Sequence, residues 1–494
     1  MQNTTCSTKL LLLMTPILLL ASPNTQERIQ TLENEIKSIK QNINYQQEDL
    51  DERMPIIEGI EKKSILDKIN LSPELLLRFD KMDYKTGKIE GENTKIYNHS
   101  DSSLNGLQRR DEYSKDFDVA TAIRFRLNMS ADLGESVKFY GRMLFANSSQ
   151  SNQRLCILSR DIKSAESSSA FDVDRAYIDY TPNRYSDYAF TFSFGLLPTT
   201  GGTPMQYAQN TTRKSMFPAL VFDMNTYGII GTQKLGSNTY IRAILARAYT
   251  MRATFYPYQC NRENIDNANI IGLYGDSKFN FLGNSLLSFG ANMLYDLKAH
   301  PYLGPDISSA DAHTLGNMLT FGLGLDIQKV ASTNTTLFLH TALSYPDGNN
   351  KIDDYQILSS TPAEQEAGLT ANNKVGFSEA NYAKGSMLSS TGYSIYLGTK
   401  YDFSSAINIG GEFNYGSEYW FSATQGAEDM YNKLATRGYV GEVYGVWKFH
   451  KNLFTKLGFM YSHEDYTGSG WHFGEPVKKD ADQTISYLTI EAKF

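Results

Sequence analysis

Residues 484–494, TISYLTIEAKF, alternate apolar and polar side chains up to the last position of the sequence. This period of two predicts a β-strand that places Leu488, Ile490, Ala492 and Phe494 on one face. A strand that runs to the end of the sequence and finishes on an aromatic side chain is typical of the closing strand of an outer-membrane β-barrel. The segment therefore predicts a barrel whose outer face contacts lipid.

The same period recurs in about sixteen segments from residue 71 onward, each long enough for a tilted strand that crosses an outer membrane. In the clearest one, residues 117–129, the apolar side chains from Phe117 to Met129 would face lipid, while Arg124 and Arg126 would face the interior. Comparable segments lie at 137–145, 287–295, 319–327, 337–345, 393–401, 407–415, 439–449 and 453–461, with weaker ones near Leu71, Val173, Tyr188, Tyr227, Thr239 and Ile270.

The connections between these segments tend to alternate in length. Short ones include residues 130–136, 181–187, 402–406 and 450–452, and long ones are 80–116, 146–172, 196–226, 247–262, 298–318, 346–391, 416–437 and 462–483. We predict an all-β fold, a transmembrane antiparallel up-and-down β-barrel with short periplasmic turns and long external loops. A soluble β-sandwich or a β-helix would not produce this rhythm. An even number of strands pairs the last strand with the first, although about 14 or about 18 strands would also fit.

Composition and charge agree with a barrel. Aromatic residues make up 12% of the chain, with 32 Tyr and 26 Phe, while charged residues make up only 20%. The formal net charge of -7 and the lack of a basic stripe argue against a nucleic-acid partner. The apolar run at residues 10–21 is shorter than the roughly 20 residues of a membrane-spanning helix, and it follows a lysine, so we predict a signal peptide at 1–22. Whether Cys156 and Cys260 pair after export stays open.

A short α-helical coiled coil is predicted before the barrel. Apolar residues occur at the a and d positions of a heptad, at Ile29, Leu32, Ile36, Ile39, Ile43 and Leu50. Isoleucine at both positions favours trimers or tetramers over dimers, although a single amphipathic helix packed on another surface would show the same pattern. The predicted domains are therefore a signal peptide at 1–22, a periplasmic coiled-coil segment at 23–70 and an outer-membrane barrel at 71–494.

No motif for catalysis, a cofactor or phosphate binding occurs in the sequence, so we do not expect an enzyme. A loop with His463, Glu464, Asp465 and His472 could bind a metal, but a solvated loop is the simpler interpretation. Residues that alternate with the lipid-facing ones point inward, and this places several polar side chains on the water-facing wall. The wall is basic in one part and carries both signs of charge elsewhere, so it could favour anions or could consist of paired charges. The pore-lining candidates are Arg124, Arg126, Lys138, Tyr140, Arg142, Arg175, Glu412 and Glu442.

The long connection at 196–226 is rich in Gly and Pro and too apolar for a fully solvated loop. It either folds inward and narrows the lumen, or forms an external lid or a subunit contact. For the inward fold, the candidate residues of the constriction are Arg213, Lys214, Phe217 and Asp223.

In its strand number, terminal aromatic residue and third loop, the chain resembles the general bacterial porins, and its coil resembles that of sucrose-type and phosphate-selective porins. The stretches KKSILDKIN at 62–70 and FDVDRAYIDY at 171–180 are similar to an uncharacterised Gram-negative outer-membrane family, a domain of unknown function. The third loop lacks the acidic character common in general porins, so the resemblance does not imply a preference for cations.

From these patterns we expect a passive outer-membrane channel for small hydrophilic solutes, biased toward anions and trimeric through its periplasmic coil. No cofactor is expected, and lipid is the expected surroundings of the barrel. The alternative is a structural or adhesive surface protein that uses the barrel as an anchor.

Overall fold

The structure is a computed structural model. It describes residues 27–40, 43, 69–86, 95–97, 107–109, 113–148, 169–252, 265–299, 313–348, 390–424, 431–466, 476 and 478–493. The predicted signal peptide, Cys156, Cys260, His472 and the terminal Phe494 lie outside the described residues. The chain divides into two compact units, Met1–Ile69 and Asn70–Phe494.

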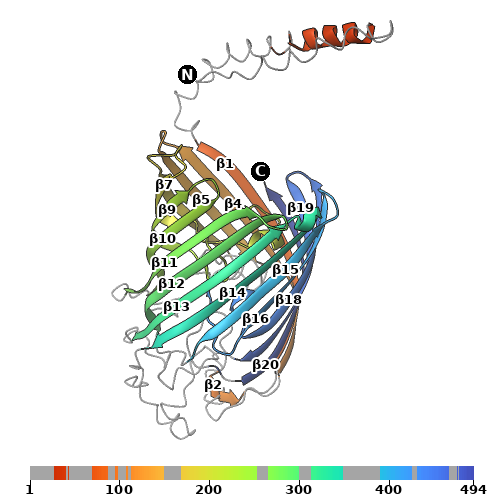
Figure 1. The fold of residues 1–494 in the computed structure, drawn as a ribbon. Coiled ribbons are helices and arrows are strands. Elements are labelled where there is room, and N and C mark those ends of the chain that lie inside the picture. The colour runs from red at the N-terminus through yellow and green to blue at the C-terminus, as the bar shows by residue number, and fades with distance from the viewer. Residues whose placement is uncertain are drawn as a thin grey trace. The chain divides into compact units, whose positions relative to one another are not determined.

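Sixteen strands form one closed barrel, which Figure 1 shows as a ring of tilted arrows. The barrel strands are β1 (Ile69–Thr86), β4 (Tyr113–Asp132), β5 (Val137–Ser148), β6 (Ser169–Tyr180), β7 (Phe190–Leu197), β9 (Thr226–Leu235), β10 (Thr239–Arg252), β11 (Ile265–Asn280), β12 (Asn284–Ala299), β13 (His313–Gln328), β14 (Thr335–Gly348), β15 (Gly392–Asp402), β16 (Ile407–Gly416), β18 (Gly438–His450), β19 (Leu453–Tyr466) and β20 (Lys478–Lys493). Each predicted segment corresponds to one of these strands, so the predicted barrel of about sixteen strands is confirmed.

The barrel closes where the first and last strands meet, as predicted. β1 and β20 pair antiparallel from Glu74 opposite Lys493 to Thr86 opposite Ala481. This register places Phe79 opposite Leu488.

Side chains alternate between the two faces of the barrel wall. On β13, Leu319, Phe321 and Leu323 point outward and are 46%, 43% and 47% exposed, whereas the intervening Thr320 and Gly322 are buried on the inside. The same alternation gives the other strands an exposed apolar outer face. An apolar surface of this extent is stable in the hydrocarbon of a bilayer rather than in water. No helix in the described part of the chain is long and apolar enough to cross a bilayer.

Glycines on the inner face make room for tyrosine rings from neighbouring strands. A Cβ atom added at Gly458 on β19 would lie 2.2 Å from the ring of Tyr487 on β20, and one at Gly410 would lie 2.3 Å from the ring of Tyr444. By contrast, a Cβ at the outward-facing Gly445 would meet nothing within 4 Å. Side chains are therefore tightly packed around Gly458 and Gly410 inside the barrel, whereas the outer face at Gly445 is open.

The described part of the N-terminal unit is helical over residues 27–40 and at residue 43. Its apolar residues Leu32, Ile36, Ile39 and Ile43 are 55%, 54%, 55% and 52% exposed. These exposed fractions describe one chain without partners, so they do not test whether helices of several chains pack together. The coiled coil stays a prediction.

Candidate functional site

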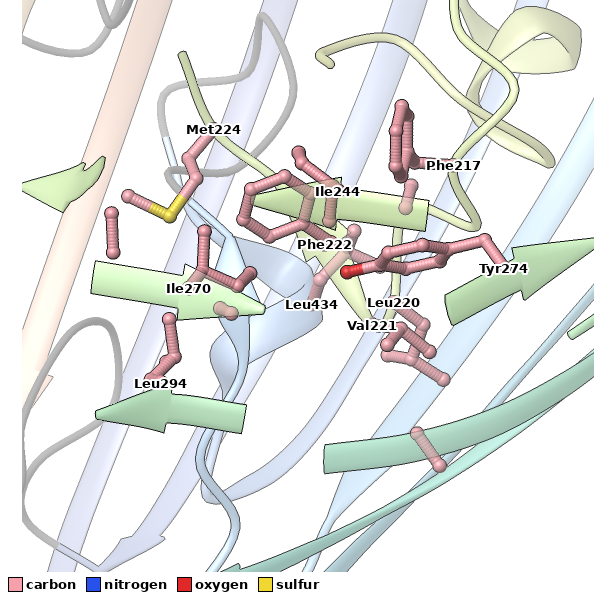
Figure 2. Close-up of a cluster of buried hydrophobic side chains, with 14 of the residues drawn as sticks. Phe217, Leu220, Val221, Phe222, Met224, Ile244, Ile270, Tyr274, Leu294 and Leu434 are labelled. Carbon is pink, nitrogen blue, oxygen red and sulfur yellow. The ribbon is translucent and has the colours of Figure 1, made fainter. Parts of the chain in front are cut away.

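The connection between β7 and β9, residues 198–225, lies inside the barrel and contains the short helix α3 (Met205–Ala208) and the two-residue strand β8 (Phe222–Asp223). Figure 2 shows Phe217 and Phe222 of this loop packed against Ile244 and Tyr274 of the wall. The ring centroids of Phe217 and Tyr274 are 4.6 Å apart in an edge-to-face arrangement. Of the two positions considered from the sequence, the structure therefore has the inward one.

Polar contacts fix this loop to the wall on several sides. Arg175 on β6 donates to the backbone oxygen and the hydroxyl of Thr200, at 3.1 and 3.0 Å. The Thr203 hydroxyl donates to Asp326 on β13, whose other carboxylate oxygen lies 2.8 Å from Nε2 of His340. Because these contacts come from strands on different sides of the loop, they hold it across the lumen.

The four predicted constriction residues are all in this loop but have different surroundings. Arg213 forms an ion pair with Asp276 on β11 at 3.2 Å, and Lys214 is half-buried, with its backbone N–H 3.0 Å from the oxygen of Gly201. Phe217 is buried in the apolar cluster, and Asp223 accepts a hydrogen bond of 2.7 Å from the Gly201 N–H. Arg213 thus combines a charge with a contact to the barrel wall.

A second inward connection was not predicted. Residues 417–424 and 431–437, between β16 and β18, carry the strand β17 (Ala423–Thr424) and the 3₁₀ turn η8 (Lys433–Ala435). Trp420 is 1% exposed, and its indole N–H donates to the oxygen of Leu434 at 2.8 Å. The sequence contained a signal for this inward connection. Trp420, Phe421 and Leu434 are large apolar side chains, which are usually buried and are not expected in an external solvated loop.

The two inward loops bind each other inside the barrel. β8 and β17 pair in parallel, with Phe222 opposite Ala423 and Asp223 opposite Thr424. The Ser422 hydroxyl also donates to the oxygen of Leu220 at 3.0 Å. Their apolar side chains and those of the β9–β15 wall form one buried cluster, which fills this side of the lumen.

A buried charge cluster anchors the second loop to the wall. Nζ of Lys433 lies 2.5 Å from a carboxylate oxygen of Glu412 on β16 and 2.5 Å from one of Glu442 on β18. Tyr396 donates its hydroxyl to Glu412 at 2.6 Å, and Lys456 lies 3.3 Å from Glu442. The two predicted pore-lining glutamates do face the interior, but here they neutralise a loop lysine.

The predicted arginines line the inner face of β4, β5 and β6. Arg124, Arg126 and Arg142 are 2%, 3% and 2% exposed. Arg142 makes a two-pronged ion pair with Asp174, at 2.7 and 2.5 Å. A β-bulge in β6 shifts the register between Val173 and Arg175 and turns Asp174 inward, so parity alone does not predict this partner.

The remaining wall candidates lie nearer the short turns. Lys138 is 3.0 Å from Asp132, and the ring of Tyr140 stacks on that of Tyr177 with centroids 4.9 Å apart. Both tyrosines are only partly buried, so they border solvent-accessible space.

A polar cavity of about 1040 Å³ lies between the first inward loop and the short-turn end of β11–β18. The loop contributes Gln206, Tyr207 and residues 210–213, and the wall contributes Lys278, Lys329, Lys400 and Lys448. Among the described residues that line this cavity, Asp402 is the only acidic one. The arrangement can hold a hydrated anion or a polar anionic solute, because positive charge converges on one water-filled space.

A second group of polar side chains lies on the other face of the wall. Nδ1 of His463 on β19 is 2.9 Å from Asp482 and 3.9 Å from Asp480 on β20, and its Nε2 is 3.3 Å from Asp465. The ligand atoms of His463, Asp480 and Asp482 lie within 4.8 Å of one another, a spacing that could hold a metal ion. The sequence indicated His463 and Asp465, but pairing of the strands was needed to bring in the two residues of β20.

Among solved structures, similar folds include OprB of Pseudomonas putida, with a TM-score of 0.44 and 10% identity over 87% of this chain and 95% of that chain. OmpF of Salmonella typhi, solved in complex with daunomycin, has a TM-score of 0.41 and 11% identity over 86% and 97% of the two chains. OmpT of Vibrio cholerae has a TM-score of 0.41 and 10% identity over the same shares. No curated protein matches the chain. A family model described as "Protein of unknown function (DUF3373)" matches residues 114–490, most of the barrel, and the chain therefore belongs to this family.

Proposed function

We propose that the protein is a passive outer-membrane channel for small hydrophilic solutes, with a preference for anions. The observation that carries the proposal is the cationic cavity inside a closed barrel whose outer face is apolar. A closed barrel satisfies all of its strand hydrogen bonds in lipid, and a charged water-filled space inside it would attract one sign of ion.

The anion preference rests on the cavity more than on the arginine wall. Asp174 neutralises Arg142, and Thr200 occupies donors of Arg175, so these two groups offer less charge to a solute than the sequence suggested. In the cavity, Lys278 and Lys448 form no ion pair with any described residue. Their charges are therefore available to attract an anion that enters from the short-turn end.

Reconstitution of the full chain into planar bilayers tests the proposal. We expect single-channel conductance and, with asymmetric KCl, a reversal potential of the sign that chloride permeation gives. The double variant Lys278→Gln/Lys448→Gln should move the reversal potential toward zero, whereas Lys451→Gln, an exposed turn residue outside the cavity, should leave it unchanged. Absence of conductance contradicts the channel, and a cation preference of the unmodified protein contradicts the bias.

We place the short turns and the N-terminal helix in the periplasm, where the helix would hold three protomers together. Its exposed isoleucines at a and d positions support an assembly larger than a dimer. In lipid, contacts between barrels would add to those of the coil.

A structural or adhesive surface protein is the second candidate function. The packing of both inward loops into one apolar cluster supports it, because a filled lumen suits an anchor. Deletion within the long loop 346–391 tests this candidate: loss of binding to cells, with the barrel still folded and non-conducting, is the expected result.

A further inference from the structure

We propose that the cavity at the short-turn end is a binding site for a small polyhydroxylated solute that carries a phosphate group. The proposal deepens the proposed function and rests on it, since the solute would reach this site through the channel. Two properties of the cavity lead to this ligand class: an excess of positive side chains, and a large number of amide and hydroxyl groups beside them.

The charges come from different elements but converge on the same space. Lys278, Lys400 and Lys448 are on β11, β15 and β18, Lys329 is in the turn after β13, and Arg213 is on the inward loop. Five positive side chains face one acidic one there, a formal charge of +4.

Not all of this charge is free. Asp402 lies 2.7 Å from Lys400, and Asp276 lies 3.2 Å from Arg213 and also 3.2 Å from Arg242, which is outside the cavity. Lys278, Lys329 and Lys448 have no carboxylate partner in the described part of the chain. Three unpaired ammonium groups around one space suit a dianion better than chloride, because several of them can act on the same ligand.

The rest of the lining is suited to hydroxyl groups. It includes the side-chain amides of Gln206, Asn210, Asn238, Asn280, Asn284 and Gln328. Each amide offers two donors and an acceptor, which matches the mixed donor and acceptor character of a sugar hydroxyl. The phenol oxygen of Tyr207 accepts a 3.3 Å hydrogen bond from Gln328, which fixes the orientation of one of these amides.

The size of the cavity is also adequate. Its volume of about 1040 Å³ is at the upper end of the range for small-molecule sites, so a hexose phosphate would fit together with several water molecules. The exposed Lys278 and Lys329 show that the space opens toward solvent at the short turns. A ligand can thus enter without displacement of the inward loop.

Calorimetric titration of the full chain in detergent tests the site without any need for conductance. The probes are glucose 6-phosphate, glucose and sodium sulfate. We expect glucose 6-phosphate to bind. Glucose lacks the phosphate group and sulfate lacks the sugar hydroxyls, so each should bind at least about tenfold more weakly. Lys278→Gln and Lys448→Gln should each weaken glucose 6-phosphate about fivefold, as expected for the loss of one partly solvated charge contact. Lys451→Gln is the matched control and should bind as the unmodified protein does.

The outcomes separate this proposal from the channel itself. Glucose 6-phosphate binding that persists unchanged in the Lys278→Gln/Lys448→Gln double variant overturns the site, as does equal binding of sulfate or glucose. Binding with the expected variant pattern but without conductance in bilayers supports the site and contradicts the channel. Conductance without glucose 6-phosphate binding supports the channel and overturns the site.

Discussion

Replacement of Lys433 by methionine should release the second inward loop from the barrel wall. The lysine is 2% exposed and lies 2.5 Å from both Glu412 and Glu442, so its removal leaves buried carboxylates without their shared cation. Glu442 keeps Lys456 at 3.3 Å, whereas Glu412 keeps only the hydroxyl of Tyr396 among its described partners. The loss of the cationic partner therefore affects mainly Glu412.

Loss of one partner from a buried ion pair costs about 3–5 kcal/mol, because the remaining charge stays desolvated. Lys456 offsets part of this cost, so we expect about 3 kcal/mol for Lys433→Met. If that energy holds the loop in the lumen, the population with a detached loop should rise about 100-fold. Two carboxylates would then become accessible to ions in the pore.

The assay combines unfolding in urea with single-channel recording. Lys433→Met should unfold at lower urea, and its channels should conduct more and prefer chloride less than those of the unmodified protein. Lys433→Arg, which keeps the charge, should lose less stability, and Glu412→Gln added to Lys433→Met should recover part of the loss. If Lys433→Met matches the unmodified protein in both measurements, the charge cluster does not hold the loop and the reasoning is refuted.

Three further predictions concern the barrel, the coil and the apolar cluster. Gly458→Val should reduce the folded fraction in a heat-modifiability gel because of its clash with the Tyr487 ring, whereas Gly445→Val, with open space outside the barrel, should fold normally. Ile36→Asp should convert the proposed trimer to monomers in native mass spectrometry, because a charge at a heptad core position is desolvated in the assembly; an unchanged mass would contradict the coiled coil. Phe222→Ala should lower stability by about 3–5 kcal/mol and increase conductance, since a buried aromatic ring between the two loops is lost; unchanged urea unfolding would contradict its role in joining them.

The strands could be predicted from the sequence because a barrel in lipid imposes one pattern on every strand. Each side chain faces either hydrocarbon or the interior, so Leu319, Phe321 and Leu323 identify an outer face without any tertiary information. Pairing of β1 with β20 then follows from closure with an even strand number. Strand ends were less predictable, because strands such as β13 continue beyond the apolar segment that identified them.

The charge partners in the lumen could not be predicted by the same counting. Parity placed Arg142 and Glu412 on the inner face, but it carries no information about loops that enter the barrel. Lys433 reaches Glu412 from such a loop, and Asp174 reaches Arg142 because of a bulge. The alternation of apolar and polar residues predicts on which face of a strand a side chain lies. It does not predict the course of a loop that enters the barrel, and the contacts between the wall and such a loop depend on that course.

The structure divides the lumen into two chemically different sides, and this division bears on the path of solutes. The apolar cluster of the two inward loops packs on the inner face of β9–β15, whereas the arginines face inward on β4 and β5. Water and ions avoid the first surface because apolar side chains offer no hydrogen bonds, and Arg124, Arg126 and Arg142, which are only 2–3% exposed, offer little surface to a passing anion. For the proposed channel, the expected path therefore avoids the apolar cluster and passes Lys278 and Lys448 of the polar cavity at the short-turn end. Lys433 anchors the second inward loop, which is part of this cluster, to Glu412 and Glu442, so its release should widen the passage from the filled side.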